Sequence, residues 1–214
     1  MLKPLLIIST LFMPLSSWAG SLGDVTTNMG VVTKHMLRGV KQSNADIVVS
    51  AGIDYQGPLG LYAGAWGYTG SIEDFDNSEV NAYAGGAYSI LGISLGLGVI
   101  QYERGSDHRA NIETNNTEYN VNVAWHDYRL SSYQDSDTKD KYHELAANYA
   151  LWGDAGIVLS AGVVRLDASD DEAWNYGLRF VKAMPSNVDF EVNISRHDDK
   201  GNSLVLSMTR QFDW

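Results

Sequence analysis

The sequence predicts an all-β fold: a transmembrane antiparallel β-barrel of twelve strands with both termini on the periplasmic side. Three observations lead to this prediction. The chain ends in an alternating segment closed by an aromatic residue, it begins with a segment typical of exported proteins, and its internal alternating segments are joined by connections that are short and long in turn. The composition agrees, because 21 glycines and only four prolines suit many strands and few helices.

The final segment, residues 202–214, separates into an apolar and a polar face. The apolar positions are Leu204, Leu206, Met208, Phe212 and Trp214, and the polar positions are Ser203, Ser207, Thr209, Gln211 and Asp213. Such a strand suits the closing strand of a membrane barrel. Arg210 falls on the apolar face, close enough to the periplasmic end for its charge to reach the head groups. The segment also resembles the terminal signal of outer-membrane proteins, so we expect the insertion machinery to bind the strand that ends in Phe212 and Trp214.

The first 19 residues have the pattern of a secretory signal peptide. Lys3 is their only charge, residues 5–15 are apolar, and Ser17 and Ala19 provide the small residues that precede cleavage before Gly20. We therefore expect residues 1–19 to be removed on export and residues 20–214 to form one outer-membrane barrel domain. The expected surroundings are bacterial outer-membrane lipid and lipopolysaccharide.

Charge and hydropathy exclude several other classes. The formal net charge of −11 disfavours nucleic acid as a partner. After Gly20 the chain has no apolar run of about 18 residues, which excludes a helical membrane protein. It also has no cysteine, so neither a lipid-anchored lipoprotein nor disulfides are expected.

Six internal segments alternate cleanly, and five more do so weakly. The clean segments are 47–56, 93–99, 118–126, 144–151, 174–180 and 188–195, and the weaker ones are 25–38, 59–69, 80–89, 128–134 and 157–166. With the final segment they make twelve. Periodicity alone does not say which face points inward, because a soluble barrel has apolar residues inside and a membrane barrel has them outside. The signal peptide, the aromatic terminus and the connections favour the membrane barrel.

The connections alternate between short turns and longer segments that are mostly rich in acidic residues. The short ones are 56–59, 89–92, 127, 151–155 and 183–187, and the long ones include 70–78, 104–115, 136–140 and 167–172. Short periplasmic turns and long outer loops produce this alternation. Twelve strands spaced by ~4.8 Å and tilted by ~40° give a backbone radius of about 12 Å. Inward side chains then leave a passage of roughly 6 Å radius at most.

Three stretches near the start carry a family resemblance: residues 33–43 (TKHMLRGVKQS), 52–55 (GIDY) and 60–67 (GLYAGAWG). Together they resemble the TorF-type porins, a bacterial outer-membrane family of largely unassigned function. His35 stands where that family usually has tyrosine, and Tyr68 with Thr69 replaces a usual Ser-Asn pair. The resemblance implies an outer-membrane location and a barrel fold, and it says little about the substrate.

Charged residues on the polar faces are the candidate pore lining. They are Arg38, Asp54, Glu118, Glu144, Arg179, Asp189 and Glu191. Arg38, with Gly39 at the end of the first expected strand, either contacts solute at the mouth or forms an ion pair with Asp54 or another wall acid. Because charges that line a pore set its ion preference, the excess of acids predicts a passive channel for small neutral or cationic solutes.

Two other function classes stay open at this stage. One is a structural or adhesive barrel with a closed, mutually paired interior. The other is an outer-membrane enzyme that hydrolyses lipid or peptide. The histidines are scattered, no serine lies in a Gly-x-Ser-x-Gly turn, and the adjacent acid-base pair His126 and Asp127 falls at a short turn and not in a cleft. The acidic loops lack the spacing of a calcium loop, so we expect no metal site in them. From the histidine and serine pattern we expect neither catalysis nor a cofactor.

Overall fold

The computed structural model describes residues 23–42, 47–69, 78–104, 116–169 and 171–214. The strands are β1 (Asp24–Val32), β2 (Met36–Leu37), β3 (Val40–Lys41), β4 (Val48–Gln56), β5 (Leu61–Tyr68), β6 (Glu79–Ile90), β7 (Ile93–Arg104), β8 (Asn116–Trp125), β9 (Tyr128–Asp135), β10 (Lys141–Ala150), β11 (Ala155–Arg165), β12 (Glu172–Met184), β13 (Val188–His197) and β14 (Gly201–Asp213). A single turn of 3₁₀-helix, η1 (Pro58–Gly60), lies between β4 and β5. The expected signal peptide and parts of the acidic connections lie outside the described residues.

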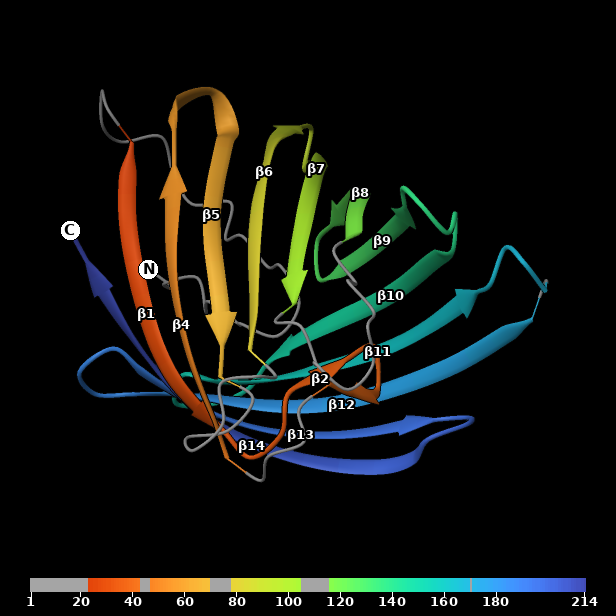
Figure 1. Cartoon of the computed structure of the whole chain (residues 1–214). Coiled ribbons are helices and arrows are strands. Elements are labelled where there is room, and N and C mark those ends of the chain that lie inside the picture. Colours follow the sequence, from red (N-terminus) through yellow and green to blue (C-terminus); the bar gives the residue numbers. More distant parts are fainter. Residues whose placement is uncertain (1–22, 43–46, 70–77, 105–115, 170) are drawn as a thin grey trace.

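Twelve strands form one closed antiparallel barrel (Figure 1). Each strand from β4 to β14 pairs with the next along the chain, and β1 closes the ring by pairing with both β14 and β4. The closure leaves no unpaired edge in the wall, which a strand-built protein needs in lipid. The prediction of a twelve-stranded antiparallel barrel is confirmed.

The two faces of the wall follow the predicted alternation. On β14, Leu204 and Leu206 are exposed on the outside, whereas Val205 between them is buried inside. On β8, Tyr119 and Val121 are exposed outward, and the neighbouring inner face carries polar side chains. An apolar outer face around a polar interior is the arrangement of a membrane barrel, because lipid rather than water surrounds the wall.

Both ends of the barrel chain lie at the end that carries the short turns. Thr26 near the start of β1 pairs with Asp213 near the end of β14. The terminal Trp214 completes the closure: its indole nitrogen donates to Thr27 Oγ1 at 2.9 Å, and its backbone nitrogen donates to the Val25 carbonyl at 3.1 Å. That this end faces the periplasm stays a prediction.

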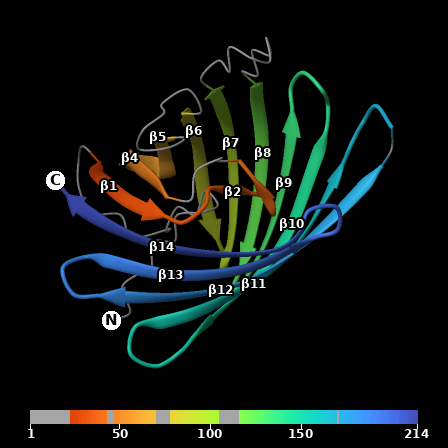
Figure 2. The same ribbon diagram turned by 60° about the horizontal axis from the view of Figure 1, so that its bottom comes forward.

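The first strand is shorter than predicted, and the expectation of one strand over 25–38 is wrong. β1 ends at Val32, and the chain then turns inward as the short hairpin β2–β3, which both views place within the curve of the wall (Figures 1 and 2). At its tip, Arg38 (φ 53°) and Gly39 (φ 80°) form a two-residue turn. Positive φ at both positions defines the tight turn that suits a two-residue hairpin. The predicted strand is interrupted earlier, at residues 33–35, which are not in a strand.

Inside the barrel, tyrosine side chains lie over glycines of neighbouring strands. A Cβ atom added at Gly64 would meet the Tyr83 hydroxyl at 2.4 Å, one at Gly85 would meet Tyr62 Cζ at 2.4 Å, and one at Gly162 would meet the Tyr142 hydroxyl at 2.3 Å. These glycines therefore provide the space in which the rings lie against the wall. Each tyrosine ring occupies the space that a side chain at the glycine position would fill.

Candidate functional site: the barrel interior and its hairpin

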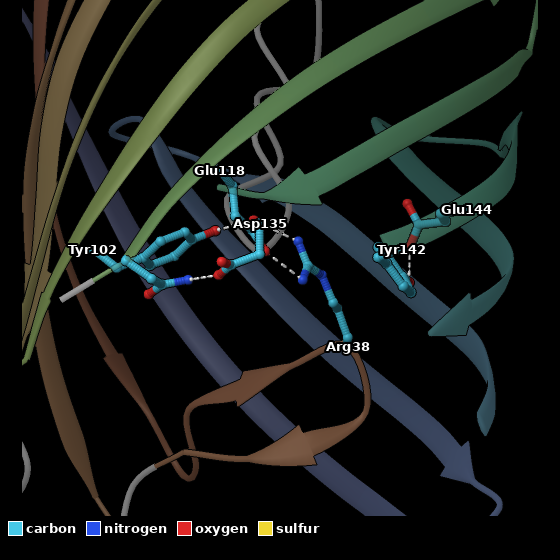
Figure 3. A network of polar contacts seen from close by, with 7 residues as sticks. Arg38, Tyr102, Glu118, Asp135, Tyr142 and Glu144 are labelled. Atoms are coloured by element: carbon cyan, nitrogen blue, oxygen red, sulfur yellow. Dashed lines mark hydrogen bonds and ion pairs between the residues drawn. The ribbon is translucent and has the colours of Figure 1, made fainter. Parts of the chain in front are cut away.

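Arg38 at the hairpin tip is bound across the lumen to Glu118 on β8 (Figure 3). Its two terminal nitrogens, Nη1 and Nη2, donate to the two carboxylate oxygens of Glu118, each at 2.7 Å. Tyr102 on β7 donates to the same carboxylate at 3.0 Å. This two-pronged geometry is the strongest that arginine and a carboxylate form. Of the two predicted alternatives for Arg38, the structure has the ion pair with a wall acid, and this acid is Glu118 and not Asp54, because Asp54 lies on β4 and the hairpin extends towards β8.

Two aromatic rings enclose the guanidinium of Arg38. Its Cζ lies 4.5 Å from the ring centre of Tyr142 and 5.0 Å from that of Tyr133. The two rings are buried and lie 6.0 Å apart. A cation over aromatic faces gains electrostatic attraction. Two kinds of interaction, an ion pair and ring contacts, therefore fix the hairpin tip to β8, β9 and β10.

The remainder of the hairpin touches other parts of the wall. At the tip, a Cβ atom added at Gly39 would lie 3.1 Å from Asn175 Cβ and 3.3 Å from His197 Cβ, so the turn packs against β12 and β13. At the base, the His35 ring lies 4.1 Å from the Tyr68 ring and 5.1 Å from the Trp66 ring, both on β5. The hairpin therefore crosses the lumen, and it does so near the end of the barrel that carries the long connections.

Two further arginines face the interior of the same half, each beside a glutamate. Arg129 Nη2 on β9 lies 3.4 Å from Glu144 Oε1 on β10, and Arg179 on β12 lies 4.0 Å from Glu191 on β13. All four side chains are buried. Together with Arg38, Arg129, Glu144 and Arg179 line a cavity beside the hairpin. In this half of the wall each arginine is thus balanced by one glutamate.

In the other half of the wall, the inward acids lie on strands that contain no base. The strands β1, β4, β5 and β6 contain no lysine or arginine. Asp54 on β4 accepts hydrogen bonds from the Tyr83 hydroxyl and from the Asn28 amide, the latter at 3.3 Å. Glu79 on β6 is buried and accepts from the Asn81 amide at 2.9 Å. Neutral donors make the contacts described for Asp54 and Glu79.

Asp189 and Asp135 also accept hydrogen bonds from neutral groups, unlike the glutamates that lie beside arginines. Asp189 on β13 accepts from the Gln211 amide at 3.4 Å. Asp135 at the end of β9, which Figure 3 labels, accepts from the Asn116 amide at 2.6 Å. It also accepts from the backbone nitrogens of two residues in the following turn. Neutral groups supply these hydrogen bonds too. The interior therefore keeps an excess of negative charge. The electric field of this charge attracts cations into the lumen.

All seven predicted residues lie inside the barrel, on the inner face of a strand or at the hairpin tip. The structure brings Arg38 together with Glu118, and Arg179 together with Glu191, whereas Asp54 and Asp189 lie apart from any of the other five. Sequence reasoning missed Glu79 and Asp135 as interior acids. It also missed that Arg129 pairs with Glu144. The signal for all three was available, since each falls at an inner position of its strand once the strand register is known.

Among the residues described, no group of three or more histidines and acids is arranged to hold a metal ion. No helix within these ranges is long and apolar enough to cross a membrane. The adjacent acid-base pair His126 and Asp127 forms the tight turn between β8 and β9, where the His126 ring packs 4.7 Å from the Trp125 ring.

A closed wall with an apolar outer face and a polar interior places the protein among the membrane β-barrels. The sequence matches, over residues 18–207, a family described as "Bacterial protein of unknown function (Gcw_chp)", and the chain belongs to this family. No curated protein matches the sequence. The description of this family does not mention TorF-type porins, so the resemblance to them stays a prediction.

Solved porin structures share the fold. The structure described as "KdgM porin" superposes with a TM-score of 0.63 at 9% identity, and the alignment covers 88% of this chain and 99% of that one. The same porin "in complex with disordered oligogalacturonate" gives 0.61 at 9% identity, over 88% of this chain and 99% of that chain. A third structure, from work on in-meso crystallization of membrane proteins, superposes with a TM-score of 0.57 at 10% identity. The alignment covers 89% of this chain and 84% of that chain. At these identities the likeness concerns the fold.

Proposed function

We propose that the protein is a passive channel of the bacterial outer membrane for small neutral or cationic solutes. The observation that carries this proposal is the lining of the barrel: a polar interior in which acids exceed arginines, with one half of the wall free of bases. Charged rings and patches in a pore select ions by electrostatics. The porin fold of the similar structures supports the same proposal, as does the TorF-type resemblance of residues 33–67.

The proposed class of solute follows from the sign of the net charge on the residues that line the lumen. Oligogalacturonate, named with the similar porin, is an acidic sugar chain, and a lumen that attracts such a chain needs an excess of bases. Here Arg38, Arg129 and Arg179 each lie beside a glutamate, so little positive charge is left to attract an anion. We therefore propose neutral or cationic solutes. In this proposal the chain is exported by a cleaved signal, inserted through its last strand, and surrounded by lipid and lipopolysaccharide.

The hairpin across the lumen favours a second candidate, a barrel that does not conduct. Its tip is fixed to the wall by the Arg38–Glu118 pair and its base touches Trp66 and Tyr68, so it narrows the passage from both sides. Such a barrel would have a structural or adhesive role. We propose no catalytic role for the two histidines of the described interior, because His35 packs in an aromatic cluster and His197 lies buried under the hairpin tip, where its Nδ1 accepts from the Asp199 backbone nitrogen.

Single-channel recording of the folded protein in a planar bilayer separates the two candidates. A channel gives discrete current steps in the wild type, and larger steps when residues 35–42 are replaced by a short Gly-Ser linker. A silent wild type whose linker variant conducts would mean that the hairpin closes a potential pore. If both proteins are silent although each migrates as a folded barrel on unheated gels, the channel proposal is wrong.

A further inference from the structure

A cavity of about 80 Å³ lies between the hairpin β2–β3 and the half of the wall that carries the arginines. Met36, Arg38 and Gly39 of the hairpin form one side of it, and inner-face residues of β9 to β13 form the other. Figure 3 shows Arg38 on the hairpin side and Tyr142 with Glu144 on the wall side. One water needs about 10–15 Å³ by this measure, so the cavity has room for several waters or for one solute of about six non-hydrogen atoms.

The floor of the cavity is open because Gly177 on β12 has no side chain. The strand register places Gly177 between Ser160 on β11 and Ser195 on β13. Among the described residues other than its chain neighbours, a Cβ atom added at Gly177 would meet only Ser160 within 4 Å, its Oγ at 2.6 Å and its Cβ at 4.0 Å. At Gly162, by contrast, the Tyr142 ring fills the corresponding space. The space above Gly177 therefore belongs to the cavity.

Hydroxyl and amide groups line the part of the cavity that a solute can reach. Ser160, Asn193 and Ser195 line it, and each is partly exposed to the barrel interior. A hydroxyl and an amide both donate and accept hydrogen bonds. Met36 and Val158 add apolar surface to the same cavity. A short carbon chain with several hydroxyl groups matches this lining, because each of its hydroxyls also donates and accepts.

The charged residues of the cavity leave little net charge to attract an ion. Three arginines line it, and each lies beside a glutamate: Arg38 beside Glu118 at 2.7 Å, Arg129 beside Glu144 at 3.4 Å, and Arg179 beside Glu191 at 4.0 Å. Opposite charges at such distances largely cancel each other's field further away. The lining therefore favours a neutral solute over an anion or a cation.

We propose that this cavity binds small neutral polyols, whose hydroxyl groups form hydrogen bonds with Ser160, Ser195 and the Asn193 amide. The inference deepens the proposed function, on which it rests for the route by which solute enters, and it names polyols as the class of neutral solute. Because the hairpin forms one side of the cavity, a bound polyol contacts the hairpin as well as the wall.

The test is a ligand-observed NMR titration of the folded barrel in detergent micelles, which measures binding whether or not the barrel conducts. Three probes with three carbon atoms are compared: glycerol, 1,3-propanediol and the anion glycerate. We expect glycerol to bind most tightly, because the diol lacks one hydroxyl and the anion gains no net attraction. Glycerol affinity no higher than that of the diol would overturn the inference. Tighter binding of glycerate would also overturn it, and would indicate an anion site made by the arginines.

The inference and the channel proposal can fail separately. A barrel that conducts and does not bind glycerol would overturn the inference and leave the channel proposal standing. A barrel that binds glycerol and gives no current would overturn the channel proposal and leave the polyol site standing.

Filling the cavity locates the binding. Gly177→Val places two methyl groups above the floor, and the Ser160 hydroxyl can rotate away from the new Cβ, so glycerol binding should be lost. Gly96→Val is the matched control, because Gly96 is an inner-face glycine of β7 outside the cavity, and the atoms nearest to its added Cβ are 3.7 Å away. We expect it to keep wild-type affinity. Unchanged binding in Gly177→Val, or equal losses in the two variants, would contradict the site.

A milder variant guards against misfolding of Gly177→Val. Ser195→Ala removes one hydroxyl and keeps the cavity open, so glycerol affinity should fall about fivefold, the size of one neutral hydrogen bond. Ser50→Ala is the matched control, since Ser50 is a partly exposed inner-face serine of β4 in the opposite half of the wall. Equal affinities in the two serine variants would contradict the role of Ser195. Unheated-gel migration identifies which variants are folded, and the comparison among the three probes requires no variant.

Discussion

The two halves of the barrel wall balance their charges in opposite ways. Around β8 to β13, arginines lie beside glutamates, and the hairpin tip adds Arg38 to the pair with Glu118. Around β1 and β4 to β6, the acids meet tyrosine and asparagine, with no base in the strands. The difference indicates a division of roles, in which the half with arginines, the paired half, anchors the hairpin, and the acids of the other half, together with Asp135 and Asp189, present net charge to the lumen.

Removing the hairpin should produce the largest change in conductance, because the hairpin is what the paired half of the wall anchors. If residues 35–42 are replaced by a short Gly-Ser linker, the obstruction across a passage of roughly 6 Å radius disappears. Single-channel conductance should then rise several-fold. The closing hydrogen bond from the Thr33 backbone nitrogen to the Leu206 carbonyl, 3.0 Å, lies outside the replaced segment, so the wall should close as before. Unchanged conductance would show that the hairpin does not limit the pore.

Releasing the hairpin tip should have the next largest effect. Arg38→Ala leaves Glu118 buried without its ion-pair partner, and breaking a buried pair costs about 3 kcal/mol. Urea unfolding of the barrel should register this loss, and bilayer currents should become larger and noisier. Arg38→Lys keeps the charge but loses the two-pronged geometry, so its loss should be smaller. Currents and stability equal to the wild type in Arg38→Ala would remove the pair from any role in the lumen.

Filling a glycine below a tyrosine tests how the paired half holds its rings. Gly162→Ala forces Tyr142 to move, because the new Cβ would lie 2.3 Å from its hydroxyl, and overpacking costs about 1–3 kcal/mol. Gly96→Ala is the matched control, since the nearest atoms to its Cβ are 3.7 Å away. Urea unfolding should separate the two variants. Equal stability would mean that Tyr142 shifts without loss.

The wall was predictable from the sequence, and the interior only in part. Strict alternation identifies strands and their inner faces, which is why the twelve strands and the interior charges on them were found, Arg38 at the hairpin tip excepted. The hairpin was not found, because residues 25–38 alternate well enough to suggest one strand, although Arg38-Gly39 between Leu37 and Val40 is a two-residue turn signal. The Arg38–Glu118 pair spans 80 positions and depends on how far the hairpin extends, which no local pattern encodes.

Ion selectivity measured by reversal potential across a salt gradient tests most directly the claim that the base-free half sets the charge of the lumen. The wild type should lean towards cations. Asp54→Asn should reduce that preference clearly, whereas Glu118→Gln should change it less, because the neighbouring Arg38 already neutralises the Glu118 charge. A larger shift from Glu118→Gln than from Asp54→Asn, or an anion-selective wild type, would contradict the division between the two halves.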